Sequence, residues 1–226
     1  IQIVKKFQLL FFVLYVSIIC YLLFSYLIFS KVGPDSGFYL ATGLKFYEGK
    51  IYFHEIGISY NPLAIAIFGL PYLFSENPSY IWHLAINMLV ILSASAVLYA
   101  ILKLIAGRKL LNIYFTLFFI LISLVLDGKH VLLEPISVFF QLVALYFYLK
   151  YLKDFELKRI FLAVLFISLA FLSKQYGLFI IIPIGLDLLL RNPFKLKIPI
   201  LLILGFLIPI VLFFTYLNFY GVEFLE

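Results

Sequence analysis

The chain alternates long apolar runs with short polar segments. Seven runs have the composition of membrane-spanning helices, and they cover residues 7–29, 81–105, 110–126, 131–149, 160–173, 176–190 and 198–220. A helix rises about 1.5 Å per residue and needs about 20 residues to cross ~30 Å of hydrocarbon. With 65% hydrophobic and 12% charged residues, the chain has more apolar surface than a soluble domain of this size could bury. The pattern predicts an all-α membrane protein with about seven transmembrane helices, folded as one membrane domain over residues 1–226.

The charges between the runs predict which side each loop faces, because cytoplasmic loops are enriched in Lys and Arg. Twelve of the 17 basic residues fall on one side: Lys5, Lys6, Lys103, Arg108, Lys109, Lys150, Lys153, Lys158, Arg159, Arg191, Lys195 and Lys197. Eight of the 11 acidic residues fall on the other: Asp35, Glu48, Glu55, Glu76, Asp127, Glu134, Glu223 and Glu226. We expect a cytoplasmic N-terminus in a cell inner or plasma membrane. Topology explains the net charge of +6, so no nucleic-acid partner is expected.

Residues 160–190 could form one span or two. One helix of that length would reach ~46 Å, well beyond the hydrocarbon core, and would place Arg191 outside. We therefore predict two short spans joined by a turn at 173–177. Each limb reaches only ~22 Å, so Lys174 in the turn should be recessed in a polar pocket, where an ionisable residue is a functional candidate. The alternative is that the Lys174 side chain extends to the outer interface.

The loop at 30–80 is predicted to carry two short juxtamembrane helices. One helix start lies at 34–36 with a glycine stop at Gly49. Asn61-Pro62 opens the second, over 63–74, which Pro71 interrupts. Irregular backbone near membrane depth survives only where protein covers it or where it lines a wet cavity. This loop is therefore the first place to look for chemistry.

The pattern indicates only a few loop residues as candidates for catalysis or metal binding. Asp35 is predicted to cap its helix, worth ~1 kcal/mol, and a cap can also be a catalytic base. His54 and Glu55 are adjacent and would point apart on a regular element, which argues against a metal pair. His130 and Glu134 are four residues apart at the start of a predicted span, so they could share a helix face and help to hold a metal. A plain helix-terminus acid is the favoured interpretation of Glu134.

Three stretches resemble one family. Residues 33–52 read Gly-Pro-Asp-Ser-Gly-Phe-Tyr-Leu-Ala-Thr-Gly-Leu-Lys-Phe-Tyr-Glu-Gly-Lys-Ile-Tyr, and Tyr-Asn-Pro-Leu follows at 60–63. This pattern resembles the first outer loop of GT-C glycosyltransferases of the family 39 type, the dolichyl-phosphate-mannose protein mannosyltransferases and bacterial aminoarabinose transferases. Leu-Glu-Pro at 133–135 resembles the family's second acidic position. Leu-Ala-Phe-Leu-Ser-Lys-Gln-Tyr-Gly at 169–177 resembles its span that ends in a lysine turn.

The resemblance implies a function on the non-cytoplasmic side. A sugar carried on a polyprenyl phosphate in the bilayer is transferred, with inversion, to an acceptor glycan, lipid or protein. Asp35 would be the general base, and Lys174 would bind the donor phosphate. The remaining substrate-binding candidates are Tyr39, His54, Glu55, Tyr60, His130, Glu134, Gln175 and Tyr176.

The chain departs from the family in two ways. Many relatives carry Asp-Glu where this chain has Asp35-Ser36, so we assign no metal or other cofactor, and a divalent metal stays an open alternative. The chain is also shorter than the family's usual length, so we expect the C-terminal remainder to be absent from it. The competing functions are a transporter or flippase of lipid-linked saccharide and an inactive structural subunit. A transporter would more often show paired repeats with broken helices near the midplane, and the sequence has no such symmetry.

Overall fold

The computed structural model describes residues 2–29, 31–50, 62–128, 130–191 and 197–219. Every regular element within these ranges is a helix, which confirms the predicted all-α class. In chain order the elements are α1 (Gln2–Phe29), α2 (Pro34–Tyr47), α3 (Pro62–Gly69), the 3₁₀ helix η1 (Leu70–Leu73), α4 (Tyr80–Ile105), α5 (Lys109–Asp127), α6 (Glu134–Asp154), α7 (Leu157–Ser173), the 3₁₀ helix η2 (Gln175–Ile180), α8 (Ile181–Arg191) and α9 (Lys197–Phe219).

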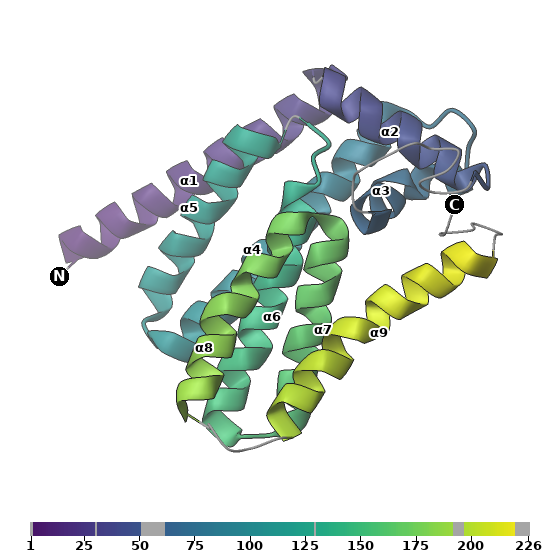
Figure 1. Cartoon of the computed structure of the whole chain (residues 1–226). Helices are drawn as coiled ribbons and strands as arrows, with labels where there is room; N and C mark the ends of the chain where they lie inside the picture. The colour runs from purple at the N-terminus through teal and green to yellow at the C-terminus, as the bar shows by residue number, and fades with distance from the viewer. Residues whose placement is uncertain (1, 30, 51–61, 129, 192–196, 220–226) are drawn as a thin grey trace.

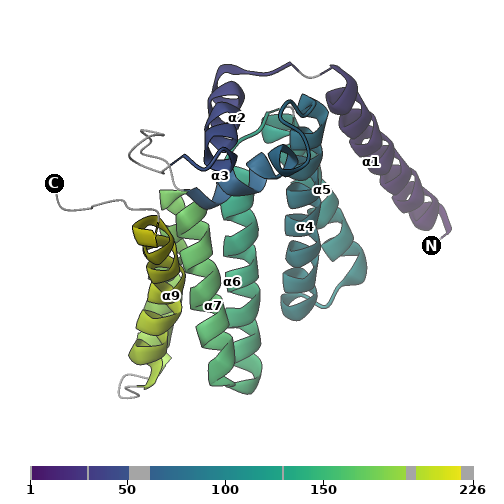
Figure 2. The same cartoon turned by 90° about the vertical axis from the view of Figure 1, so that its right-hand side faces the viewer.

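The long helices form a bundle, and the short helices α2 and α3 gather at one end of it (Figures 1 and 2). Within the bundle α6 packs against both α4 and α7, α9 packs against α7, and α5 packs against α1 and α4. The end that carries α2 and α3 also holds the start of α6 and the end of α7 (Figure 2). Residues from the first half and the second half of the chain therefore meet at this end.

Helix length and composition fit a membrane setting. Among the described residues, α4, α5 and α6 are the three helices long and apolar enough to cross a bilayer. Shorter apolar helical segments occur at Phe12–Ile28, Pro62–Leu73, Gln175–Leu188 and Ile200–Phe213. The seven predicted apolar runs coincide with α1, α4, α5, α6, α7, η2–α8 and α9. The protein is an integral membrane protein, and its seven-span count stays a prediction.

Both predicted juxtamembrane helices are confirmed. Helix α2 ends just before Gly49, which has φ +79°, and α3 begins at Pro62 and passes into η1. The two helices pack closely, because a Cβ on Gly43 would lie only 3.2 Å from the Cα of Gly69. The Tyr47 hydroxyl also donates a hydrogen bond to the carbonyl of Ala66 at 2.9 Å.

The predicted cap of α2 is wrong in one respect. Gly33 is the N-cap and has no side-chain cap hydrogen bond, Pro34 takes the first helical turn, and Asp35 follows inside that turn. Proline has no N–H to satisfy and its fixed φ suits the first helical position, so the cap moves back to Gly33. Asp35 still lies where the helix macrodipole favours an acid.

The predicted break between two short limbs is confirmed at the end of α7. Lys174 has an extended backbone (φ −163°, ψ 141°) between α7 and η2. The turn closes when the N–H of Gly177 donates to the carbonyl of Lys174 at 2.8 Å. A Cβ on Gly177 would lie 2.3 Å from the carbonyl carbon of Ala170, so a glycine is needed for this close approach. The turn therefore fixes the backbone of Lys174 where the chain passes from α7 to η2.

Candidate functional site

The centre of the candidate site is an ion pair between Lys174, after α7, and Glu134, the first residue of α6. The Lys174 Nζ donates to Glu134 Oε1, and only 15% of the lysine side chain is exposed. The second carboxylate oxygen, Glu134 Oε2, is buried and has no hydrogen-bond partner in the protein. Burying charged groups is costly unless they are paired and hydrogen-bonded. The pair therefore joins a recessed ammonium group to a glutamate whose side chain is 42% exposed and whose second carboxylate oxygen has no protein partner.

Two residues that the sequence argument did not single out complete this cluster. Asp127, at the end of α5, lies close enough to Glu134, His130 and Lys174 to interact with them electrostatically. The amide of Asn87, a fully buried residue of α4, donates to the backbone carbonyls of Asp127 at 3.0 Å and His130 at 2.8 Å. Asn87 thereby fixes the positions of both neighbours. A lone Asn inside an apolar run is the signal that could have found it, because polar residues within spans mark functional or packing sites.

The start of α2 is tied to the same cluster. Ser36 Oγ accepts a buried hydrogen bond from the N–H of Val131 at 3.0 Å. A Cβ on Gly33 would lie 3.1 Å from Nδ1 of His130. Residues 130–134 therefore contact the start of α2 on one side and, through Glu134, Lys174 on the other.

Asp35 and Lys174 lie at the same end of the bundle without direct contact. Asp35 is exposed in the first turn of α2, next to Ser36. Within the described ranges, no hydrogen bond or ion pair joins its carboxylate to Lys174. The segment 130–134, in which Val131 and Leu133 are buried, contacts the start of α2 through Val131 and Lys174 through Glu134.

The other predicted site residues have mixed outcomes. His130 precedes α6, which begins at Glu134 after the irregular residues 131–133. The expectation that His130 and Glu134 share a helix face is therefore wrong, because Pro135 in the first turn fixes a later helix start. Tyr39 is buried in the cluster of side chains between α2, α3 and α6. His54, Glu55 and Tyr60 lie outside the described residues.

The two residues that follow Lys174 are exposed. Tyr176 stacks on Phe179 with ring centroids 6.1 Å apart, and the Lys174 Nζ lies 5.6 Å from the Tyr176 ring centroid. A cation near an aromatic ring is stabilised by the ring's quadrupole. Gln175 is exposed beside them. No three His, Cys, Asp or Glu side chains come together as possible metal ligands within the part of the chain that the structure describes.

An apolar cleft of about 370 Å³ lies near the same end of α7. Its walls come from α2, α3, α7 and α9, namely Phe46, Pro62, Leu63, Ala66, Leu169, Leu172, Pro209, Leu212 and Phe213. Leu169 and Leu172 belong to the last turns of α7, the helix that ends at Lys174. Helix α7 therefore lines the apolar cleft with its last turns and leads directly into Lys174.

Comparison with known families gives a match that includes this ion pair and cleft. The model of the dolichyl-phosphate-mannose-protein mannosyltransferase family matches residues 46–225, which is most of the chain. The chain belongs to this family. No curated protein and no solved structure matches it. Family membership indicates a mannosyltransferase-type glycosyltransferase that uses a polyprenyl-phosphate sugar donor in a membrane. Glu134 and Lys174 lie inside the matched region of this mannosyltransferase-family chain, whereas Asp35 precedes it.

Proposed function

We propose that this chain transfers a sugar, with inversion, from a polyprenyl-phosphate donor to an acceptor on the non-cytoplasmic side of the membrane. The observation that carries the proposal is the recessed Lys174 at the end of a helix that also lines an apolar cleft. A polyprenyl-phosphate sugar has the matching parts, an isoprenoid tail and a phosphate. Mannose, which the family description names, is the first sugar to test.

The donor phosphate binds at Lys174 and the first isoprene units enter the cleft. When the bond from the anomeric carbon to the phosphate oxygen breaks, polyprenyl phosphate leaves with the electron pair and gains negative charge. A fixed cation that interacts more strongly with the product-like charge than with the donor lowers the barrier. Glu134 holds the ammonium group in place before the donor arrives, and the phosphate then competes with this carboxylate for Lys174.

Asp35 is the proposed general base. Its carboxylate takes the proton from the acceptor hydroxyl or amine while that oxygen or nitrogen attacks the anomeric carbon. Attack from the side opposite to the phosphate inverts the anomeric configuration. Ser36 and Gly33, which contact residues 130–134, position the start of α2 relative to the Lys174 side of the site.

The test uses membranes from the producing cell, because they contain the natural acceptors. Transfer from radiolabelled polyprenyl-phosphate mannose is measured with the full chain, with Asp35→Asn, and with Glu48→Gln at the other end of α2 as the matched control. We expect Asp35→Asn to lower transfer by about 100-fold or more without loss of donor binding, and Glu48→Gln to retain transfer. Unchanged transfer by Asp35→Asn would remove Asp35 from the mechanism.

A further inference from the structure

Five basic residues lie at the end of the bundle opposite to α2 and α3, where α4 ends, α5 begins and α6 ends (Figure 2). We call them the basic surface: Lys103, Arg108, Lys109, Lys150 and Lys153. The Lys153 Nζ donates to the carbonyl of Leu104 at 3.0 Å, which joins the end of α6 to the end of α4. Arg108 and Lys109 are close in the chain, because only residues 106–108 separate α4 from α5. Lys150 lies three residues before Lys153, so the two share a face of α6.

No carboxylate neutralises the basic surface. The sequence has no Asp or Glu in residues 77–126 or 135–153, the two stretches that carry these five cations. Among the described residues, none of the five forms an ion pair. The other acids at this end pair with basic residues around α7 and α8: Asp154 with Arg159, Glu156 with Lys158 and Arg159, and Asp187 with Arg191. This end of the bundle therefore has a paired half and a half with positive charge alone.

The position of the basic surface indicates which anions can reach it. Four of its five residues are exposed and Lys150 is half-buried. Like charges repel, and the repulsion grows as the groups approach one another, so a bound anion would relieve it. Helices α4, α5 and α6 are the three described helices that are long and apolar enough to cross a bilayer. Their ends therefore lie near a membrane surface, where the anions nearest to them are the phosphates of lipid head groups.

We propose that the basic surface binds the head groups of anionic phospholipids, such as phosphatidylglycerol, in the leaflet at this end of the bundle. Ammonium and guanidinium groups donate charge-assisted hydrogen bonds to phosphate oxygens, and clustered Lys and Arg beside a membrane attract anionic lipids. A zwitterionic head is selected less, because its own cation is repelled by the five basic residues. The proposal uses neither Asp35 nor Lys174, so it does not depend on the proposed transferase mechanism.

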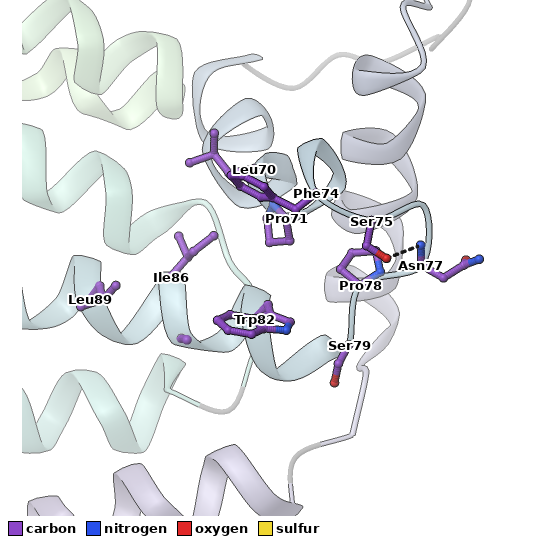
Figure 3. Close-up of a pocket in the computed structure, with 11 residues that line it drawn as sticks. Leu70, Pro71, Phe74, Ser75, Asn77, Pro78, Ser79, Trp82, Ile86 and Leu89 are labelled. Carbon is purple, nitrogen blue, oxygen red and sulfur yellow. Dashed lines mark hydrogen bonds between the residues drawn. The ribbon is translucent and has the colours of Figure 1, made fainter.

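The other end of α4 has a contrasting surface. An apolar cavity of about 550 Å³ lies between η1 and the start of α4, with Leu70 and Pro71 on one side, Ile86 and Leu89 on the other and the ring of Trp82 between them (Figure 3). Within the part of the chain that the structure describes, none of its lining residues is charged. Trp82 is the only tryptophan in the chain and is 65% exposed. Its fluorescence therefore reports on lipid at a place where charge does not select the head.

Binding of the first added lipid is measured by native mass spectrometry of the full chain in detergent, with phosphatidylglycerol or phosphatidylcholine of the same acyl chains. We expect the glycerol lipid to bind more tightly by more than about fivefold, the effect of one cation at a membrane surface. The preference should decline as ionic strength rises, because salt screens exposed charges. Equal binding of the two lipids would overturn the proposal and leave an acidic soluble partner as the ligand to test.

Three double variants locate the lipid. Lys103→Gln/Lys109→Gln should reduce the preference to less than about twofold, since about fivefold is lost with each cation, and Lys103→Arg/Lys109→Arg should retain it. Lys158→Gln/Arg191→Gln is the matched control, because it removes the same charge from the same end but from residues that pair with acids. Equal losses in the two Gln variants would show that net charge, rather than the basic surface, selects the lipid, and would overturn the proposal.

Trp82 tests whether the selection is local. The same proteins are reconstituted in vesicles that contain phosphatidylcholine or phosphatidylglycerol with dibrominated chains, and quenching of Trp82 fluorescence is measured. We expect the two lipids to quench equally, and quenching by the choline lipid also shows that each variant is inserted in the bilayer. Stronger quenching by the glycerol lipid would mean that anionic lipid accumulates around the whole protein, which would contradict a site at the basic surface.

Discussion

The two ends of the helix bundle both carry ion pairs, but the pairs differ in their surroundings. At the end that holds α2 and α3, which we call the Lys174 end, a largely buried lysine pairs with Glu134 and leaves one carboxylate oxygen without a partner. At the opposite end, the Arg191 end, the ion pairs vary in exposure, and only 20% of the Arg159 side chain is exposed. Arg191 Nε donates to Asp187 at 2.6 Å with 54% of the arginine side chain exposed, and Arg159 Nε donates to Glu156 at 3.2 Å.

The polar contacts of the Arg191 end connect neighbouring helices. The Tyr148 hydroxyl of α6 donates to Asp187 of α8, and Lys153 Nζ of α6 donates to the carbonyl of Leu104 of α4 at 3.0 Å. Each of these two side chains has its partner on a neighbouring helix, so each contact connects two helices. An exposed ion pair such as Arg191–Asp187 contributes little to stability.

The Lys174 end instead brings Asp127, His130, Glu134 and Lys174 together, and α7, which leads into Lys174, also lines an apolar cleft. Such a cluster is costly where water is scarce, and buried charges at membrane depth are by default functional. A charged pair that lies among further titratable groups is therefore a better candidate for a site than a pair that connects neighbouring helices.

Removing one cation at each end tests whether the two ends differ in function. We expect Lys174→Met to lower transfer from polyprenyl-phosphate mannose by more than about 100-fold, the cost of losing one preorganised stabilising group, and to weaken donor binding. Arg191→Met should leave both quantities within about twofold, since exposed pairs contribute little. Transfer rate and donor affinity are measured on the same membranes. Equal losses at the two ends would show that the distinction has no functional meaning.

A smaller effect is expected from the turn that orients Lys174. In Gly177→Ala the new Cβ would overlap the backbone at Ala170, at 2.3 Å from its carbonyl carbon. Overpacking of this kind costs about 1–3 kcal/mol, so thermal unfolding in detergent should shift downward and donor binding should weaken. Gly185→Ala in α8 is the matched control, because a Cβ there meets nothing within 4 Å. An unchanged melting temperature for Gly177→Ala would show that the turn adapts without strain.

The sequence predicted the features that depend on local pattern and length. A run too long for one span and too short for two full spans implied the turn at Lys174. Prolines typical of helix starts implied α2 and α3. It failed where position depends on long-range packing. Asp127 joins the cluster because Asn87, 40 residues earlier, binds its carbonyl, and no periodicity reports such a contact. His130 was placed on a helix because the apolar run begins at Val131, whereas Pro135 sets the start of α6.

A further prediction concerns the contact between α2 and residues 130–134. Ser36→Ala removes the 3.0 Å hydrogen bond from the buried N–H of Val131 to Ser36 Oγ, and losing a buried hydrogen bond costs about 1 kcal/mol. We expect a lower melting temperature and slower transfer with little change in donor affinity, since Lys174 is untouched. Ser75→Ala is the control, because Ser75 Oγ accepts only an exposed contact from the N–H of Asn77 at 3.3 Å. Weaker donor binding in Ser36→Ala would indicate that α2 also positions the donor.

The smallest effect is expected for Glu156, at the Arg191 end. Lys158 and Arg159 beside Glu156 hold the pKa of its carboxyl below the ordinary value of 4.5. Because folding lowers this pKa, the contribution to stability is present above the ordinary value and is lost as pH falls through the lowered pKa. Wild type and Glu156→Gln should therefore differ slightly in melting temperature at neutral pH and converge in acid.

The Glu156 side chain is 43% exposed, so solvent screening keeps that difference small. Transfer measured across the same pH range should be the same for both proteins once each rate is expressed relative to its own maximum. If Glu156→Gln slowed transfer as much as Lys174→Met does, the ion pairs at the two ends of the bundle would matter equally for transfer. The contrast between the two ends would then have to be explained by long-range coupling through α6 and α7, the helices that carry charged groups at both ends.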